Sequence, residues 1–498
     1  MGQIVAAVDL GTSKSIALVA QKDYSGKLSV LKTETIDSKN AIRRGRIYNS
    51  VEASEIISKL IWKLNNKPEM QVEKIYVGIG GQSLHTQLFS VKRTVESGII
   101  TQQLLDSIKE EGFNYKPEFE ENLGIFSCEF YADGQLTSTP RGTMASVVEA
   151  RFQLVVGNPC LKRNLEAVFN KKDISVAGYF ISPLATAEAV LTQEEKESGC
   201  ALIEWGEGVT YVSVYKNKVL RYMATLPLGG LAITKDIRSL NVLEEEAEAL
   251  KIKYGRAVPD QDNDESIPVN KEQSSSWKIK LFDLNSIIEA RVDEIVKNIW
   301  NLIKISGYSQ ELNSGIVITG GGASLRDLPQ FIKNQTGKEV RLVNAKVLVN
   351  QIETYFPPAN SCVVGLVALG KDNCVKENLI LTPTNLDKDK ENDKNKEREK
   401  QRQIEKDRER QIEKEKQRQI EKEKQKEKER QRQIEKEQEK ERRKKEGDIK
   451  IMKGVKIFIN KGLELFKDED FEDTTNKPVE EDNEEIQPED NDFDNNKN

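Results

Sequence analysis

The stretch Val8-Asp9-Leu10-Gly11-Thr12-Ser13-Lys14 forms a short turn between two apolar runs, and it decides how the fold is interpreted. The runs, residues 4–8 and 16–20, are continuous and partly β-branched. Two such runs joined by a turn of Gly, Thr and Ser predict a β-hairpin. Glycine backbone N–H groups, hydroxyls and a lysine at the tip all favour an anion. The sequence therefore predicts a hairpin whose turn binds phosphate.

Five residues of this turn are candidates for that chemistry. Gly11 lets backbone N–H groups converge on a phosphate, and Thr12 and Ser13 offer hydroxyl groups. Lys14 adds a positive charge, and Asp9 can hold a metal ion through water. The segment lacks the G-x-x-x-x-G-K-[ST] pattern, so it is not a Walker P-loop. An ordinary hairpin turn can carry the same short motif, so its meaning depends on the rest of the chain.

Composition narrows the class of protein. The 498 residues include 37% hydrophobic residues, enough for a sizeable core, and the length suggests roughly three domains. The five cysteines are scattered without C-x-x-C spacing, which predicts buried reduced thiols and neither a disulfide frame nor a zinc site. His85 is the only histidine, which excludes a Ser-His-Asp triad and a His-based metal site. The net charge of −6 argues against a nucleic-acid-binding protein.

Targeting signals are missing from the sequence pattern. The first residues lead directly into a strand, without a basic-then-apolar signal segment. No run of eighteen apolar residues occurs, so we expect no membrane-spanning helix. We therefore expect a cytoplasmic chain.

Residues 1 to about 385 have the pattern of an α/β protein. Strand signals recur at residues 73–79, 200–204, 209–215 and 315–319. Helical patterns occur at residues 51–65, 160–170, 184–192, 244–254, 283–306 and 326–336. This alternation predicts mixed sheets with helices packed on them. The polar stretch 258–276 is interpreted as a surface excursion within a domain.

A second strand–turn–strand lies at residues 201–210. It carries glycines at its turn, as the first hairpin does. Its residues Gly206, Gly208 and Thr210 would hold phosphates from the side opposite the first turn. The sequence therefore predicts two phosphate turns facing each other.

Three later segments suit the remainder of a nucleotide. Gly229 and Gly230 lead into residues 233–237. Glu248 and Lys251 lie one turn apart on a helix face, where they would suit ribose hydroxyls. A strand at residues 316–319 ends in glycines that permit close approach to adenine, namely Gly320, Gly321 and Gly322. Each segment alone is weak evidence, but two phosphate turns followed by an adenosine turn, in this order, are strong evidence.

Residues 386–447 form a charged spacer in sequence. The hexamer Gln-Arg-Gln-Ile-Glu-Lys recurs there, and isoleucines spaced by eight residues advance about 80° per repeat, so they form no coiled-coil seam. We expect a solvated single helix or an extended spacer, with disorder as the close alternative.

The next segment, residues 448–467, has the pattern of a basic amphipathic helix. Its apolar stripe comprises Met452, Val455, Phe458, Ile459, Leu463 and Phe466. Lysines flank the stripe, so the helix is too polar to span a bilayer and suited to lie in a membrane interface. Docking on the protein's own body or on a partner is the alternative. Residues 468–498 carry fourteen acidic residues against two lysines, which predicts a disordered acidic tail.

The nucleotide segments resemble the actin, sugar-kinase and chaperone ATPase superfamily. Within it the chain resembles the family of FtsA, the bacterial cell-division actin homologue. The specific motifs are Asp9-x-Gly11-Thr12-Ser13-Lys14, Gly229-Gly230 followed by Thr234-x-Asp236-Ile237, and Ala247-Glu248-x-Leu250-Lys251-x-x-Tyr254-Gly255. The resemblance covers roughly residues 3–381 and 448–467. It implies an α/β, actin-like two-lobed ATPase fold that binds ATP with Mg²⁺.

The resemblance also implies a division of the chain. Residues 1–83 would form the first lobe with its phosphate turn, and residues 84–160 an inserted family-specific subdomain. Residues 161–385 would complete the actin-like body. The spacer (386–447), the membrane helix (448–467) and the acidic tail (468–498) would follow.

The function that the resemblance implies is in cell division. Such a protein tethers the FtsZ ring to the cytoplasmic face of the cell membrane at the division site, recruits later division proteins and self-associates into actin-like filaments. Two alternatives from the same superfamily are a cytoplasmic small-molecule kinase and a pilus-type actin-like assembly protein. A kinase needs a catalytic aspartate in its substrate cleft and no membrane helix, and a pilus-type protein has no obvious need of the spacer.

The second phosphate turn departs from the family pattern Asp-x-Gly-Gly-Gly-Thr-Thr-Asp. The chain has Glu204, Glu207, Val209 and Tyr211 at four of these positions. A glutamate in place of aspartate moves a metal-positioning carboxylate by about an ångström, which can cost roughly 10²-fold in a geometry-limited step. Glu207 adds negative charge beside the phosphates unless it points outward. We therefore expect ATP binding with weak or absent hydrolysis.

Overall fold

The computed structural model describes residues 2–66, 70–171, 175–261, 265–268 and 278–376. The predicted spacer, membrane helix and acidic tail lie outside the described residues. Among the helices that are described, none is long and apolar enough to cross a bilayer.

A seven-stranded mixed sheet organises the first lobe. In spatial order its strands are β11 (Ser175–Ile181), β6 (Lys74–Ile79), β1 (Gln3–Leu10), β2 (Lys14–Lys22), β3 (Leu28–Asp37), β19 (Lys346–Val349) and β20 (Ile352–Tyr355). The predicted hairpin is confirmed, because β1 and β2 pair antiparallel from Gln3 opposite Lys22 to Leu10 opposite Ser15. Residues 5–8 of β1 and 15–20 of β2 are all buried, so both faces of the hairpin are covered. This explains why each run reads as continuously apolar.

Four helices and a small hairpin accompany this sheet. They are α1 (Ser50–Leu64), α3 (Cys160–Phe169), α4 (Ser182–Val190), α10 (Ser361–Leu369) and the pair β4 (Ile42–Arg43) and β5 (Arg46–Ile47). Helix α1 packs on β2 and β3, and α10 packs on β1, β2 and β6. Asn49 caps the start of α1 by accepting the N–H groups of Val51 and Glu52, which is the usual role of asparagine at this position.

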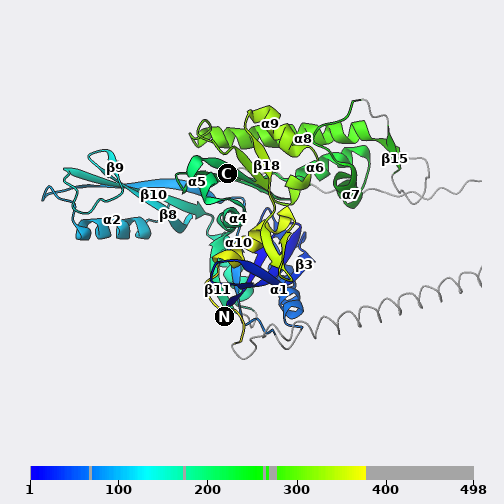
Figure 1. Ribbon diagram of the computed structural model, residues 1–498. Coiled ribbons are helices and arrows are strands. Elements are labelled where there is room, and N and C mark those ends of the chain that lie inside the picture. Colours follow the sequence, from blue (N-terminus) through cyan, green and yellow to red (C-terminus); the bar gives the residue numbers. More distant parts are fainter. Residues whose placement is uncertain (1, 67–69, 172–174, 262–264, 269–277, 377–498) are drawn as a thin grey trace, which may run out of the picture. The chain divides into compact units, whose positions relative to one another are not determined.

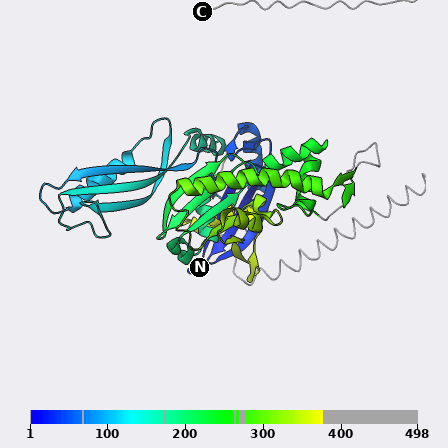
Figure 2. The same ribbon diagram turned by 90° about the horizontal axis from the view of Figure 1, so that it is seen from above.

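A nine-stranded sheet organises the second lobe. In spatial order its strands are β18 (Val340–Leu342), β17 (Ile316–Thr319), β12 (Cys200–Trp205), β13 (Thr210–Lys216), β14 (Val219–Leu226), β7 (His85–Thr94), β10 (Val147–Gly157), β8 (Glu121–Ala132) and β9 (Gln135–Thr137). Its helices are α5 (Gln193–Ser198), α6 (Gly230–Ile237), α7 (Glu244–Tyr254), α8 (Leu281–Ile305) and α9 (Leu328–Thr336). The long α8 lies along the sheet (Figure 2) and packs against β13 and β14. The strands and helices predicted from periodicity are therefore present.

Short elements complete the described chain. They are the 3-10 turns η1 (Arg238–Leu240), η2 (Gly321–Ser324) and η3 (Pro358–Asn360) and the strand pair β15 (Ser266–Pro268) and β16 (Lys278–Lys280). The polar stretch predicted as a surface excursion thus includes β15, which pairs with β16 just beyond it.

Strands β7 to β10 and helix α2 (Gln102–Asn114) form a module with its own core, drawn in cyan and blue in Figure 1. Buried side chains such as Ile108 and Phe152 make a separate apolar cluster there. The module joins the second lobe's sheet through one residue pair, Ala224 opposite His85. It lies within the insertion predicted for residues 84–160, whose boundaries stay a prediction.

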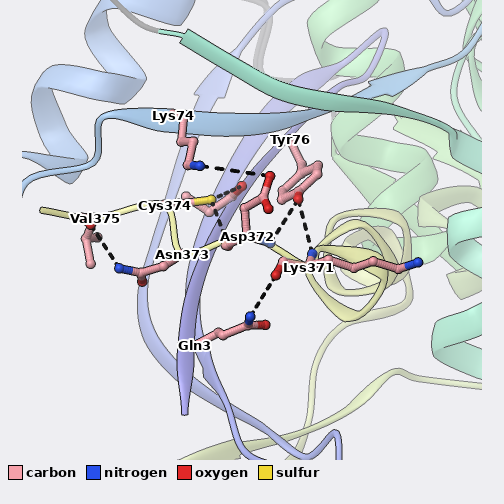
Figure 3. A network of polar contacts seen from close by, with 9 residues as sticks. Gln3, Lys74, Tyr76, Lys371, Asp372, Asn373, Cys374 and Val375 are labelled. Atoms are coloured by element: carbon pink, nitrogen blue, oxygen red, sulfur yellow. Dashed lines mark hydrogen bonds and ion pairs between the residues drawn. The ribbon is translucent and has the colours of Figure 1, made fainter. Parts of the chain in front are cut away.

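The last described residues, 371–376, are fastened to the first lobe (Figure 3), and we call them the exit segment. The Tyr76 hydroxyl accepts the backbone N–H groups of its first two residues at 3.1 and 3.0 Å. The side chain of Gln3 donates to the first carbonyl at 2.7 Å, and the N–H of Cys374 donates to the carbonyl of Ile4 at 2.7 Å. The described chain therefore ends at a fixed place, beside the beginning of β1.

Helices α4 and α10 approach so closely that glycine is required between them. A Cβ at Gly365 would lie 1.7 Å from the carbonyl oxygen of Ala185. We expect Gly365→Ala to destabilise the protein by about 3 kcal/mol or more, because the two helices would have to separate in a packed core. Urea denaturation followed by circular dichroism measures this loss.

Gly26→Ala is the matched control. Gly26 lies in an exposed turn at φ +85° with no atom within 4 Å of an added Cβ. The substitution should cost only the left-handed backbone strain of about 1 kcal/mol. Equal losses for the two variants would show that α4 and α10 are not in close contact.

Candidate functional site

A cavity of about 360 Å³ lies where the β1–β2 turn meets the β12–β13 turn and the loop after β17. This volume falls within the range of small-molecule sites. The predicted residues that line it are Asp9, Gly11, Thr12, Ser13, Lys14, Gly206, Gly208, Gly230, Glu248, Lys251, Gly320, Gly321 and Gly322. The fold thus brings residues that lie more than three hundred positions apart in the sequence together around one cavity.

The two glycine turns touch each other across the cavity. A Cβ at Gly208 would lie 2.6 Å from the hydroxyl oxygen of Thr12. That oxygen also accepts the backbone N–H of Gly45 at 3.1 Å, and the Ser38 hydroxyl donates to the Gly11 carbonyl at 2.7 Å. These contacts hold the first turn from both sides. Thr12 accepts in its bond with Gly45, so its hydroxyl group can still donate to a ligand.

Two carboxylates, Asp9 and Glu204, meet at one end of the cavity. Burial raises the pKa of Asp9, and a hydrogen bond from the Cys362 thiol partly opposes that rise. Burial, and then the charge of Asp9, raises the pKa of Glu204 to about 8. One buried oxygen of Glu204 has no hydrogen-bond partner among the described residues. At neutral pH these effects favour a protonated Glu204 beside Asp9.

Glu207 lies in the cavity wall instead of pointing into solvent. One of its carboxylate oxygens is buried without a hydrogen-bond partner among the described residues. Burial, and then the charge of Glu248, raises its pKa to about 6, while Lys39 and Lys251 act in the opposite direction. Glu207 therefore brings a carboxyl group into the cleft. Because its pKa is raised, this group loses its proton less readily than an exposed glutamate does.

Glu248 and Lys251 bind each other as well as lining the cavity. The Lys251 ammonium lies 2.7 Å from the Glu248 carboxylate and donates to the Gly230 carbonyl at 2.9 Å. It also donates to the Thr234 hydroxyl at 2.8 Å, and that hydroxyl donates to Glu248 at 2.5 Å. The pair predicted for ribose hydroxyls is thus part of a network that ties α7 to the start of α6.

The glycine loop after β17 rests on Trp205. Gly320 has φ +91°, and a Cβ at Gly322 would lie 2.3 Å from the indole ring. Trp205 is buried, and its indole N–H has no hydrogen-bond partner among the described residues. Gly321 differs from both neighbours, because the nearest atom to an added Cβ is the Ala359 side chain at 3.7 Å. Of these three glycines, only Gly321 has room for an added side chain, and that room is part of the cavity.

Two predicted site residues do not line the cavity. The Thr210 hydroxyl donates to the Leu228 carbonyl at 2.9 Å, in the loop that follows β14. A Cβ at Gly229 would lie 2.5 Å from the Gly206 carbonyl oxygen. Thr210 and Gly229 therefore support the second turn from behind. That they contact nucleotide stays a prediction.

Tyr211 is a cleft residue whose contact the sequence did not reveal. Its hydroxyl accepts the backbone N–H of Gly81 at 2.7 Å, which links β13 to the loop after β6. Burial raises the pKa of Tyr211 well above its usual value, so the phenol stays protonated. A Cβ at Gly80 would lie 2.8 Å from the same hydroxyl oxygen. Glycines at this loop were the only signal for so close an approach.

Two facing glycine turns and a third glycine loop, carried on two sheets, define an actin-like protein. Among solved structures, the chain resembles the PilM–PilN type IV pilus biogenesis complex with a TM-score of 0.51 and 13% identity. The match covers 73% of this chain and 97% of that chain, and it confirms the predicted fold.

Sequence relatives identify the family. A family model described as "Cell division protein FtsA" matches residues 201–365. The cell division protein FtsA of Porphyromonas gingivalis is 30% identical over 360 residues, 71% of this chain and 74% of the relative. The FtsA of Neisseria meningitidis serogroup B is 26% identical over 370 residues, 73% of this chain and 89% of the relative. The chain belongs to the FtsA family of cell division proteins, as the motifs predicted.

Glu207 generates a prediction about pH. Its folded-state pKa of about 6 lies above the ordinary 4.5, so between these values the folded protein binds a proton more tightly than the unfolded chain does. Stability contributed by this proton is complete below pH 4.5 and is lost as pH rises through 6. Glu207→Gln cannot ionise, so its stability relative to the parent should increase by about 2 kcal/mol from pH 4 to pH 7.

Urea denaturation of both proteins across this range, without nucleotide, measures the difference. Comparing the two proteins cancels the titration of all other groups. A difference that stays constant with pH would show that the Glu207 carboxylate is solvated and not buried.

Proposed function

We propose that this chain is a peripheral cell-division protein that binds ATP with Mg²⁺ in the described cleft. We further propose that it tethers the FtsZ ring to the cytoplasmic face of the membrane at the division site. Recruitment of later division proteins and self-association into actin-like filaments complete the proposal. The observation that carries it is the convergence of three glycine turns on one cavity in a member of the FtsA family.

The cleft residues suit the parts of a magnesium nucleotide. Backbone N–H groups near Gly11 and Gly206, with Lys14, suit the phosphates. Gly321 suits a flat base, because nothing lies closer than 3.7 Å to a Cβ added there. The unpartnered oxygen of Glu204 and the neighbouring Asp9 would suit a hydrated cation, which would supply positive charge to this end of the cavity. The buried polar atoms therefore fit the group.

Hydrolysis is proposed to be slow or absent. Glu204 places its carboxylate one methylene farther from its strand than an aspartate would, so it cannot hold an attacking water in the same position. Glu207 adds a charge that opposes phosphate binding. The proposed role is therefore a nucleotide-dependent scaffold.

Gly321→Val tests the nucleotide site. Valine at this position should fold normally, because an added Cβ meets nothing closer than 3.7 Å. Its side chain would enter the cavity, and a steric conflict of about 1–3 kcal/mol corresponds to roughly 5- to 150-fold weaker ATP binding. Titration calorimetry with Mg²⁺ and ATP measures the affinity.

Gln330→Val on α9 is the control, because Gln330 is exposed and lies outside the cavity wall. It should bind ATP as the parent does. Parental affinity in the Gly321 variant would place the base elsewhere.

The proposed tether rests on the sequence of residues 448–467, which lie outside the described residues. Five lysines accompany the apolar stripe in this segment, and each contributes about 1 kcal/mol of attraction to anionic lipid. Such a pattern favours a helix lying in the interface.

Phe466→Glu tests the tether. Losing a buried phenylalanine side chain costs about 1.5–3 kcal/mol, so co-sedimentation with anionic vesicles should weaken by roughly 10- to 100-fold. Affinity for ATP should not change. Ile412→Glu in the spacer, the same kind of substitution outside the helix, is the matched control and should bind vesicles normally. If the Phe466 variant sediments like the parent at moderate salt, the segment is a docking peptide for a protein.

A further inference from the structure

Two large aromatic side chains are exposed near the exit segment. Trp62, in the last turn of α1, is 71% exposed. Tyr24, in the turn between β2 and β3, is 90% exposed. Figure 1 shows the end of the first lobe where α1 and the N-terminus lie. Each of these side chains joins an apolar ring to a polar tip and is open to a contact outside the body.

Contacts place Trp62 beside the exit segment. Helix α1 ends at Asn65, whose side chain accepts the N–H of Val72 at 2.8 Å and donates to the same residue's carbonyl at 3.2 Å. Val72 in turn pairs antiparallel with Val375. Trp62 is therefore within one helical turn of the loop to which the exit segment is bound.

Tyr24 is placed at the same end by the first sheet. Gln3 stands opposite Lys22 in the β1–β2 pair, and the Gln3 side chain holds the exit segment. The turn that carries Tyr24 begins directly after Lys22. Both aromatic residues thus flank the exit segment, and we call this surface the exit face.

Trp62 contributes little to the fold. The opposite side of α1 supplies the core contacts, through buried residues such as Ile57, Leu60 and Leu64. Trp62 shares its exposed side with Glu55 and Lys59. An exposed tryptophan on a polar helix face is available for an external contact.

Several ion pairs lie on the exit face. Lys59 lies 3.7 Å from Glu55, Lys63 lies 3.8 Å from Glu34, and Lys376 lies 3.4 Å from Glu73. Lys27, in the turn that carries Tyr24, and Lys371, in the exit segment, are also exposed, and lysines suit anionic lipid headgroups. Tryptophan and tyrosine combine an apolar ring with a polar tip, the chemistry that favours the boundary between lipid headgroups and acyl chains.

We propose that the exit face lies against the interface of the lipid bilayer once the C-terminal segment has anchored the chain, with Trp62 as its principal contact. The proposal rests on the proposed tether. Residues 377–447 separate the exit segment from the membrane helix, and about 70 residues span at most roughly 240 Å. An anchored body is thus held at a high effective concentration, where a weak second contact becomes occupied.

This contact would orient the cleft. Gln3 lies at one end of β1 beside the exit face, whereas Asp9 lies at the other end, in the cavity wall. With the exit face on the bilayer, the nucleotide cleft is kept away from it. A long tether alone would not impose this orientation.

Quenching of tryptophan fluorescence by lipids brominated on their acyl chains tests the proposal with the full chain. Vesicles of phosphatidylcholine with phosphatidylglycerol should quench the parent protein. Trp62→Phe should lose most of this quenching and keep most of the vesicle affinity, because phenylalanine retains an apolar ring. Trp300→Phe, on α8, is the matched control and should be quenched like the parent.

Vesicle affinity supplies a second measurement. Trp62→Ser should bind about three- to tenfold more weakly, and Trp62→Phe should recover most of that loss. Because the Trp62 side chain is uncharged, this ratio should persist at high salt, where binding by the lysine-rich helix declines.

The possible failures are distinguishable. If the parent binds vesicles but Trp62→Phe is quenched equally and Trp62→Ser binds equally, the exit face does not contact lipid and the tether stands. If the parent does not bind vesicles, the tether fails and this proposal fails with it. A shift of Trp62 emission with protein concentration alone would assign the face to a second copy of the chain and overturn the lipid contact.

Discussion

The antiparallel pairing of β1 with β2 is the constraint on which both the first lobe and the cleft depend. The hairpin is covered on both faces, and β1 also pairs in parallel with β6. Slipping by one residue would exchange the side chains of the two faces, so packing fixes the register. This register places Asp9 in the cavity and Gln3 against the exit segment, at opposite ends of one strand. A single set of backbone hydrogen bonds therefore positions two distant features.

Much of this arrangement could be predicted from local patterns. The hairpin followed from two apolar runs, and Glu248 and Lys251 share a helix face because their spacing is close to one turn. The family motifs lie in backbone turns. A glycine in such a turn indicates, in the sequence itself, that another part of the chain or a ligand comes close to the backbone there. Contacts between side chains distant in sequence had no such signal. Tyr211 bonding to Gly81, and Thr210 turning towards Leu228, depend on packing that forms only in the folded protein.

Strand pairing between distant segments was equally hidden. The module of β7 to β10 extends the second lobe's sheet, although its sequence lies before that lobe. Alternating apolar residues predict a strand but not its neighbour. The spacer, membrane helix and acidic tail rest on sequence alone, because they lie outside the described residues.

The chemistry of the cleft is set by carboxylates that water cannot fully reach. Glu204 and Glu207 would be ordinary charged residues on a surface, but both have raised pKa values because they are buried beside other acids. A cation held by Asp9 and Glu204 would oppose this rise in pKa by favouring their charged forms. Under the proposed function, the same residues would disfavour a bare polyphosphate and accept one that brings its metal ion.

The fastening of the exit segment also has a mechanical side. Any tension transmitted through the C-terminal part of the chain reaches Lys376 first, where the backbone N–H is bonded to the carbonyl of Gln71. It then meets the pairing of Val375 with Val72, and only afterwards the bonds around Tyr76 and Gln3. These bonds follow one another along the chain, so a pulling force would break them one after another, beginning at Lys376. Helix α10 precedes the segment and carries Cys362, whose thiol bonds to Asp9 in the cavity wall, and it is shielded from the force until the last of these bonds has broken.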